Sequence, residues 1–213
     1  MQRRYLFMSV VFAVALMGCA YACFPKLRLW LHAGTLKQAA RKQAASAQWV
    51  DAHRYDPEWF DAARAGRVDI LRLLHEAHYP VDTRNSSGYT AVVLAAYDEQ
   101  PAALDYLLRA GANACIADHH GNTALMGAIY KGHTDIARRL LRAGCPIDQA
   151  NNAGETALAF AVLFGRNDLL ADLAHAGARL DGRDAQGQTP MAIAMKQGNQ
   201  HMVKALRQLG AVD

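Results

Sequence analysis

The sequence predicts an all-α protein, namely a solenoid of about five 33-residue helix–turn–helix units, preceded by an N-terminal transmembrane or signal helix. Two observations support this fold class. Glycines, threonines, alanines and leucines recur at a fixed 33-residue step across residues 55–213, and a fixed period of this size is the signature of stacked repeats. Residues 5–24 form a 20-residue run without a charged side chain.

Residues 1–25 are predicted to be a transmembrane anchor or signal segment. The run from Tyr5 to Phe24 would rise by ~1.5 Å per residue as a helix and would span about 30 Å, the thickness of the hydrocarbon core of a bilayer. Arg3 and Arg4 precede it, and Trp30, a residue type common at membrane interfaces, follows. We therefore expect this run to contact a membrane, and we favour an uncleaved anchor.

The fate and the orientation of this segment leave alternatives open. The sequence Ala20-Tyr21-Ala22 fits cleavage by a signal peptidase. The sequence from Leu16 to Cys19 is similar to a bacterial lipobox, in which Cys19 would carry the lipid. The arginines before the apolar run favour export, with the repeats in the periplasm and the anchor in a bacterial inner membrane. The basic residues between positions 26 and 42 instead favour a cytoplasm-facing domain.

Charge divides the chain unequally. Residues 1–50 hold seven of the 23 Lys and Arg residues and none of the 19 Asp and Glu residues, so that residues 51–213 have a net charge of −3. Residues 26–54 are accordingly predicted to be a basic helical stalk that lies against anionic lipid or is simply solvated. The remainder lacks the basic stripe that nucleic acids require, so no nucleic-acid partner is expected.

Residues 55–213 are predicted to form the repeat domain, and each recurring residue has a structural role. The threonines at the start of each first helix are expected to cap its free N–H groups; they are Thr90, Thr123, Thr156 and Thr189. Glycines supply the positive φ of each hairpin tip; they are Gly88, Gly121, Gly154 and Gly187. Leucines of the second helices fill the core; they are Leu74, Leu107, Leu140, Leu173 and Leu206. The expected repeats lie near 55–87, 88–120, 121–153, 154–186 and 187–213.

These units resemble the ankyrin repeat family. Thr189-Pro190-Met191 stands where that family has Thr-Pro-Leu, and the sequences GCPID at 144–148 and GARLD at 177–181 stand where it has Gly-Ala-Asp-Val-Asn. Some positions depart from the family pattern, since Ala124 stands in place of the proline and Glu99 in place of a glycine. The resemblance implies a non-catalytic scaffold that binds another protein.

In such scaffolds the hairpin tips and the concave face of the first helices carry the variable binding residues. Tyr97, Tyr130 and Leu163–Phe164 share one register of the 33-residue repeat, so they are expected to line up along that face, where tyrosines are frequent binding hot spots. Packing of these rings against neighbouring helices is the alternative. The predicted partner-binding residues are Tyr89, Tyr97, His119, His120, Tyr130, Lys131, Glu155, Leu163, Phe164 and Gln188.

The sequence offers no residues for catalysis, and we expect neither an enzyme nor a bound cofactor. The alternative function is haem or metal delivery through His119 and His120 in support of a redox enzyme such as catalase, because small exported bacterial ankyrin proteins are similar to this chain and some are linked to catalase function. Cys115 and Cys145 lie in successive hairpins, three register positions apart. We expect both to be small hydrophobic residues and not a disulfide.

Overall fold

The computed structural model describes residues 52–212. The predicted anchor from Tyr5 to Phe24, the lipidation candidate Cys19 and most of the predicted stalk lie outside these residues. No helix among the described residues is long and apolar enough to cross a membrane. The chain divides into two compact units, of which the larger comprises residues 56–75 and 80–213. The described part of the smaller unit consists of the 3-10 turn η1 (Ala52–Tyr55) and the segment Glu76–Tyr79.

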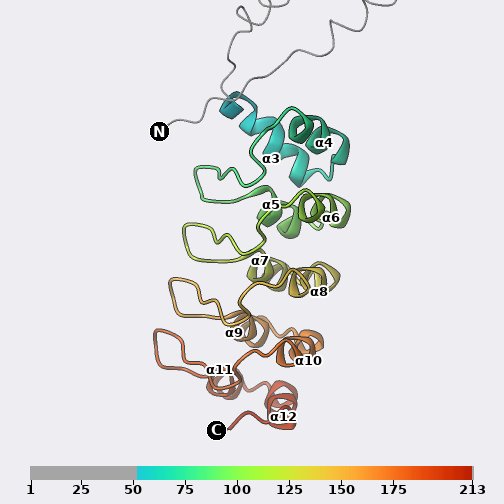
Figure 1. The fold of residues 1–213 in the computed structure, drawn as a ribbon. Coiled ribbons are helices and arrows are strands. Elements are labelled where there is room, and N and C mark those ends of the chain that lie inside the picture. Colours follow the sequence, from blue (N-terminus) through green and yellow to red (C-terminus); the bar gives the residue numbers. More distant parts are fainter. Residues whose placement is uncertain (1–51, 213) are drawn as a thin grey trace, which may run out of the picture. The chain divides into compact units, whose positions relative to one another are not determined.

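The described residues form successive pairs of short helices joined by long hairpins, without any strand (Figure 1), so the all-α prediction is confirmed for this part of the chain. The pairs are α3 (Asp56–Arg64) with α4 (Val68–Glu76), α5 (Ala91–Tyr97) with α6 (Pro101–Arg109), α7 (Ala124–Lys131) with α8 (Thr134–Leu141), α9 (Ala157–Leu163) with α10 (Leu170–His175), and α11 (Pro190–Lys196) with α12 (Gln200–Gln208). The 3-10 turn η2 (Asn167–Leu169) leads into α10.

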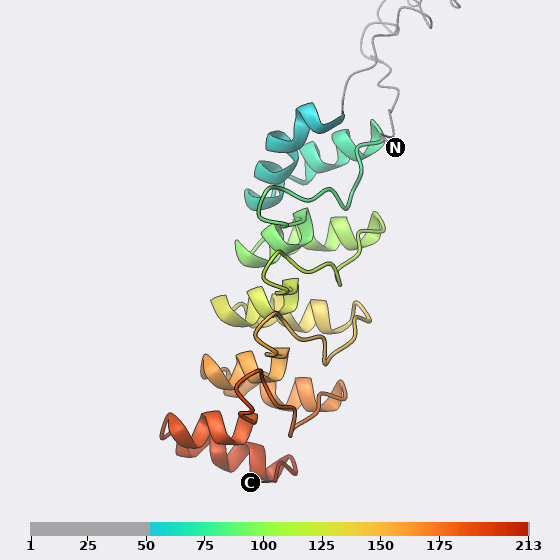
Figure 2. The ribbon, with the colours of Figure 1, turned by 90° about the vertical axis from the view of Figure 1, so that its left-hand side faces the viewer.

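The helix pairs stack in one direction, so that each first helix contacts the first helices of the repeats before and after it. Figure 2 shows the successive pairs lying roughly parallel, one below the other. The hairpins project to one side of the stack in Figure 1. Backbone hydrogen bonds join neighbouring hairpins at their tips: the N–H of His119 donates to Ser87 O (3.2 Å), and the N–H of Asn152 donates to His120 O (2.9 Å).

The first helices begin where the sequence predicts. In α5, α7, α9 and α11 the hydroxyl of the preceding threonine accepts a hydrogen bond from the N–H three residues later, at 3.1–3.3 Å. These caps satisfy N–H groups that would otherwise lack a partner within the helix. The last helix, α12, is capped in the same way by Asn199, whose side chain accepts from the N–H of Met202.

Left-handed backbone closes the turn between the two helices of a pair. Gly132 adopts φ 81° directly after α7, and glycine does so without a Cβ penalty. The equivalent position of the second repeat is Glu99, which adopts φ 55° despite its side chain. The geometry of the repeat therefore imposes a positive φ on Glu99, although a residue with a Cβ favours a negative φ.

The core includes the alanine and leucine series that the 33-residue period identified. Ala95 and Ala128 of the first helices are completely buried, as are Leu107 and Leu173 of the second helices. Small alanines let the helices approach closely, and the leucines fill the space between repeats. Because each repeat buries its apolar face only against its neighbours, the stack is the cooperative unit.

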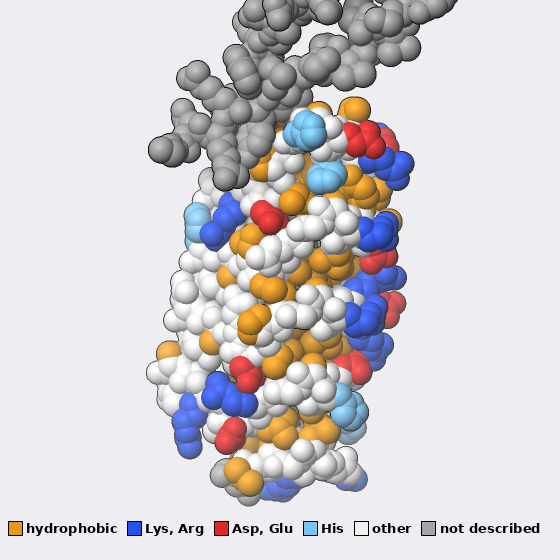
Figure 3. Space-filling view, viewed as in Figure 1, with side chains coloured by type: hydrophobic (Ala, Val, Ile, Leu, Met, Phe, Trp, Pro, Cys, Tyr) orange, Lys and Arg blue, Asp and Glu red, His pale blue; other side chains and the backbone are white. Residues whose placement is uncertain are grey.

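Charged side chains link the second helices on their outer side. Arg139 pairs with Asp105 of the preceding repeat, and Arg138 Nε lies 2.8 Å from Asp172 Oδ2 of the following repeat. Figure 3 shows Lys and Arg side chains interspersed with Asp and Glu along this edge, beside a column of hydrophobic side chains. Partly exposed pairs of this kind contribute little individually, ~0–1 kcal/mol each, so this edge is a solvated face that aligns the repeats.

Candidate partner-binding groove

Three aromatic rings from successive repeats form a continuous row at the ends of the first helices. Tyr97 is the last residue of α5, Tyr130 lies in the last turn of α7, and Phe164 directly follows α9. The centroids of the Tyr97 and Tyr130 rings are 6.2 Å apart with the rings nearly parallel. Phe164 meets Tyr130 edge to face at 4.9 Å, and Phe160 extends the row at 5.5 Å from Phe164. We call Tyr97, Tyr130, Phe160 and Phe164 the aromatic row.

The aromatic row is accessible although its rings touch one another. Tyr97 is 38% exposed, Tyr130 is 45% exposed, and the adjacent Leu163 is 37% exposed. Such exposed apolar side chains, grouped in one place, are characteristic of interaction surfaces. The rings therefore pack against each other along one side and leave a face open to solvent.

A pocket of about 280 Å³ lies between the aromatic row and the hairpins. Tyr97, Tyr130 and Phe164 contribute its aromatic wall, and Tyr89 and Asp118 contribute from the hairpins. Gly127 of α7 also lines this pocket, and a Cβ built on Gly127 would lie 3.6 Å from Tyr97 Cδ2. The pocket is thus a recess within the groove that separates the first helices from the hairpins.

Six residues that line this pocket are not among the predicted binding residues, and Asp118, Gly127 and Phe160 are three of them. A usable signal was present in the repeats themselves. The positions equivalent to Gly127 in α5, α9 and α11 hold Leu94, Phe160 and Ile193, so that α7 alone of these four helices lacks a side chain there. Comparison within the chain could have predicted a recess at Gly127.

The predicted binding residues separate into those that share this pocket and those that do not. Tyr89, Tyr97, Tyr130 and Phe164 line the pocket. Lys131 extends over the Tyr97 ring, with its Nζ 4.8 Å from the centroid. The remaining candidates lie elsewhere on the repeats: His119 and His120 are exposed at a hairpin tip, Glu155 accepts a hydrogen bond from Asn151 Nδ2 (2.8 Å), and Leu163 and Gln188 belong to the fourth and fifth repeats.

Cys115 and Cys145 form a disulfide, so our prediction that they are free small hydrophobic residues is wrong. Their Cα atoms lie 5.3 Å apart, within the range that a disulfide spans. The chain leaves Cys115 along α7 and returns along α8, which brings Cys145 back to the same end of the helix pair. The three-residue offset in register then places the two side chains opposite each other across adjacent hairpins. The spacing in the sequence alone does not show that the two hairpins face each other in this way.

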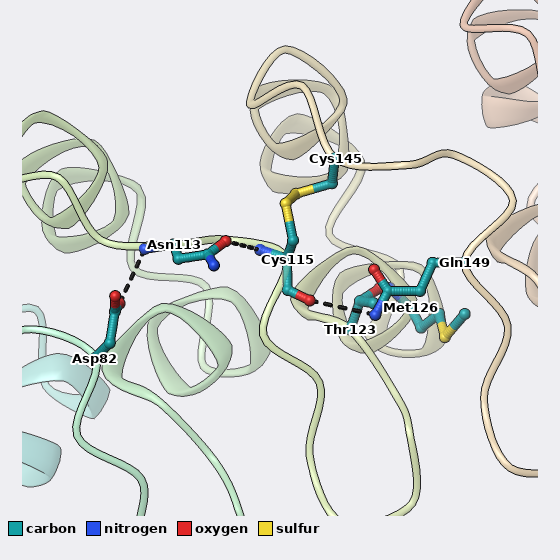
Figure 4. Close-up of a disulfide and its surroundings, with 7 residues drawn as sticks. All are labelled: Asp82, Asn113, Cys115, Thr123, Met126, Cys145 and Gln149. Carbon is teal, nitrogen blue, oxygen red and sulfur yellow. Dashed lines mark hydrogen bonds between the residues drawn. A yellow bond between two sulfur atoms is a disulfide. The ribbon is translucent and has the colours of Figure 1, made fainter.

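Hydrogen bonds hold the hairpins around the disulfide (Figure 4). The N–H of Cys115 donates to Asn113 Oδ1 at 2.9 Å, and Gln149 Nε2 donates to Cys115 O at 3.2 Å. The N–H of Asn113 in turn donates to Asp82 Oδ1 of the preceding hairpin, also at 2.9 Å. Three successive hairpins are thereby connected side by side.

The disulfide engages the sulfur of the cysteine that could have joined His119 and His120 in a metal site. Cys115 is the cysteine nearest to His119 and His120 in sequence, and its sulfur is bonded to Cys145. No group of three or more His, Cys, Asp or Glu side chains that could hold a metal ion is found in the described part of the chain. The alternative of haem or metal delivery through His119 and His120 stays a prediction.

A stack of helix pairs with projecting hairpins and an open aromatic groove defines a helical-repeat scaffold of the kind that binds other proteins. Comparison with protein families identifies which one: the model of the ankyrin repeats (3 copies) matches residues 59–151 and 140–213. The chain therefore belongs to the ankyrin repeat family. Ankyrin repeats indicate a protein-interaction scaffold and are generally non-catalytic. No curated protein matches the chain.

Proposed function

We propose that this protein is a membrane-tethered scaffold that binds a partner protein through the aromatic row and the adjoining hairpins. The observation that carries the proposal is the contact series Tyr97–Tyr130–Phe164 across three repeats, in which Tyr97 and Tyr130 are exposed and Phe164 is half-buried. Aromatic side chains supply a large contact area and are enriched at binding hot spots. Because the rings already hold one another in position, binding loses little side-chain freedom.

The binding proposal is tested by replacing Tyr130 with alanine in the full-length protein. Capture of the native partner should weaken about thirtyfold, the effect of ~2 kcal/mol that loss of a hot-spot aromatic produces. Folding should change by no more than about 1 kcal/mol, because this ring is exposed and surface substitutions are mild. The measurement combines a quantitative pull-down with a thermal melt of each variant.

Leu140→Ala is the contrasting variant, because Leu140 is only 3% exposed. It should destabilise folding by roughly 2–5 kcal/mol, the usual range for removal of a buried leucine. If Tyr130→Ala unfolds the protein as severely as Leu140→Ala, the ring belongs to the core. If Tyr130→Ala leaves capture unchanged, the aromatic row is not the binding site.

The proposal places the repeats outside the cytoplasm, with the segment from Tyr5 to Phe24 as the anchor. The Cys115–Cys145 disulfide supports this placement, because disulfides form and persist in oxidising compartments such as the bacterial periplasm and are rare in the cytosol. It favours export over the cytoplasm-facing alternative that the basic residues after position 25 left open.

The side of the membrane is tested by a reporter fused after Asp213. A reporter that is active only in the periplasm should be active, and a reporter that is active only in the cytoplasm should be silent. Rapid alkylation of thiols in intact cells should leave Cys115 and Cys145 unmodified. Activity of the cytoplasmic reporter, or alkylation of both cysteines, would reject export and leave the binding proposal intact.

A further inference from the structure

The pocket beside the aromatic row exists because of a glycine in the middle of a helix. Gly127 lies within α7, where glycine is less favourable than alanine. Its backbone does not adopt a positive φ, so the conformation does not require glycine. The neighbouring first helices carry Leu94, Phe160 and Ile193 at the same register. The one consequence of Gly127 that we find is the recess beneath Tyr97 and Tyr130.

Asp118 makes the lining of this pocket anionic. It is the one charged residue among the described residues that line the pocket, and it is only 8% exposed. Its Oδ1 accepts hydrogen bonds from the N–H groups of His120 and Asn122, both at 2.8 Å. Its Oδ2 is contacted more weakly, by Asn122 Nδ2 at 3.3 Å.

The hairpin itself does not require a carboxylate at position 118. Asn85 and Asn151 occupy the equivalent positions of the neighbouring hairpins. Each accepts the same pair of backbone N–H bonds through its amide oxygen, at 2.9 Å. The turn therefore does not need the negative charge of Asp118 to form. This charge lies in a pocket whose wall consists of aromatic rings.

The rings of this wall already accept a cation from the protein. The Lys131 ammonium lies 4.8 Å from the centroid of Tyr97, within the range of a cation–π contact. Tyr130, the most exposed ring of the row, has no cation over it in the described structure. Tyr130 and Asp118 line the same pocket, so a cation that enters this pocket from outside has an aromatic ring and a carboxylate in its lining.

We propose that the pocket at Gly127 is a recognition site for an arginine side chain of the partner. This inference rests on the proposed binding function and specifies the chemistry of the partner. A guanidinium is planar and weakly hydrated, so it stacks on aromatic faces and donates two hydrogen bonds to a carboxylate. A pocket that combines aromatic walls with one buried carboxylate is complementary to that group in shape and in charge.

The test measures binding of small probes to the full-length protein by ligand-observed saturation-transfer NMR. The probes are the Nα-acetyl amides of arginine, lysine, citrulline and norleucine, all of which have long flexible side chains. The arginine probe should bind most tightly, and the uncharged citrulline probe should bind roughly tenfold more weakly, as expected from loss of a cation–π contact and an ionic hydrogen bond. Equal binding of the norleucine probe would overturn the arginine assignment.

Matched variants locate the site. Gly127→Leu fills the recess with the side chain that α5 already carries at this register, and should abolish binding of the arginine probe without lowering the melting temperature. Asp118→Asn removes only the charge and should weaken binding about tenfold. Asp184→Asn is the control, because Asp184 Oδ1 accepts the same two backbone bonds in a hairpin away from the pocket. Unchanged binding in Gly127→Leu would overturn the proposal.

The outcomes separate this inference from the proposed function. If the arginine probe does not bind while capture of the partner still depends on Tyr130, the scaffold function stands and the arginine assignment is wrong. If neither the probe nor the partner depends on Tyr130, both are wrong. If Gly127→Leu abolishes binding of the arginine probe and also weakens capture of the partner, the pocket is the site that recognises the partner.

Discussion

Glu99 shows how the repeat imposes a conformation on a single residue. Its φ of 55° lies in the left-handed region, which costs roughly 1–2 kcal/mol for a residue with a Cβ. Its carboxylate lies 3.4 Å from Nδ1 of His133 in the next repeat, and such a partly exposed contact offsets the cost only in part. The strain persists because the packed helices on both sides fix the turn.

We expect Glu99→Gly to be more stable than Glu99→Ala by about 1 kcal/mol. Both substitutions remove the contact with His133, and only glycine relieves the left-handed backbone. Denaturant unfolding of the two variants measures the difference. Equal stability would mean that the turn relaxes to a negative φ when the side chain is shortened.

Asp69 makes the folding stability of the repeat stack depend on pH in the acid range. Hydrogen bonds from the Arg67 guanidinium, at 2.9 and 2.7 Å, lower the pKa of Asp69 from 3.8 to about 2. Because the pKa is lower in the folded protein than in the unfolded chain, the charged carboxylate stabilises folding above about pH 3.8. This contribution is lost as the pH falls from 3.8 towards 2.

We expect Arg67→Gln to return the pKa of Asp69 to its ordinary value and to remove this part of the acid dependence. Titration of the Asp69 carboxyl carbon by NMR measures the pKa directly. Asp69→Asn should remove the same part of the pH dependence of unfolding. A low pKa that survives Arg67→Gln would assign the shift to a different neighbour.

At the scale of the element, the threonine caps mark where the first helices α5, α7, α9 and α11 begin. The Thr156 hydroxyl accepts the N–H of Ala159 at 3.3 Å, and it is buried. Thr156→Ala should cost about 1 kcal/mol of folding free energy, and Thr156→Ser, which keeps the hydroxyl, should cost less. Denaturant unfolding of both variants provides the measurement, and an equal loss in the two would attribute the effect to the methyl group.

The elements were predictable because each one depends on local features that recur. A capping threonine, a turn glycine and buried leucines identify a helix pair from within its own repeat, and the aromatic register of Tyr97 and Tyr130 follows from the same period. The pocket depends on a missing side chain, because Gly127 is informative only when it is compared with the larger residues that other repeats hold at this position. The disulfide depends on how two hairpins face each other in space, and sequence spacing does not encode that geometry directly.

At the scale of the whole molecule, the disulfide makes one repeat different from the others. Cys115 and Cys145 are separated by 30 residues and enclose α7 and α8. Closing a loop of this length stabilises the folded state by roughly 3–4 kcal/mol in the chain-entropy account. Because a solenoid is stabilised repeat by repeat, this gain belongs to the middle of the stack and reaches the other repeats through their interfaces.

We expect reduction of the disulfide to lower the melting temperature of the full-length protein. The double variant Cys115→Ser/Cys145→Ser should melt like the reduced protein and should not respond to reductant, although it keeps Cys19 and Cys23. Calorimetry with and without a phosphine reductant measures both effects. Coincident melts of the oxidised and reduced protein would mean that the enclosed repeat is held by packing alone.

The same cross-link limits how far the protein can be drawn out by force. In the proposed arrangement the membrane would hold the N-terminal end of the scaffold and the partner would hold the second to fourth repeats, so a pull between them would load the repeats that carry the site. The 30-residue separation between the bridged cysteines keeps roughly 100 Å of chain from extending. If the protein is tethered as proposed, its oxidised form should extend less under load than its reduced form, and the segment that the disulfide closes is the repeat that carries the Gly127 pocket.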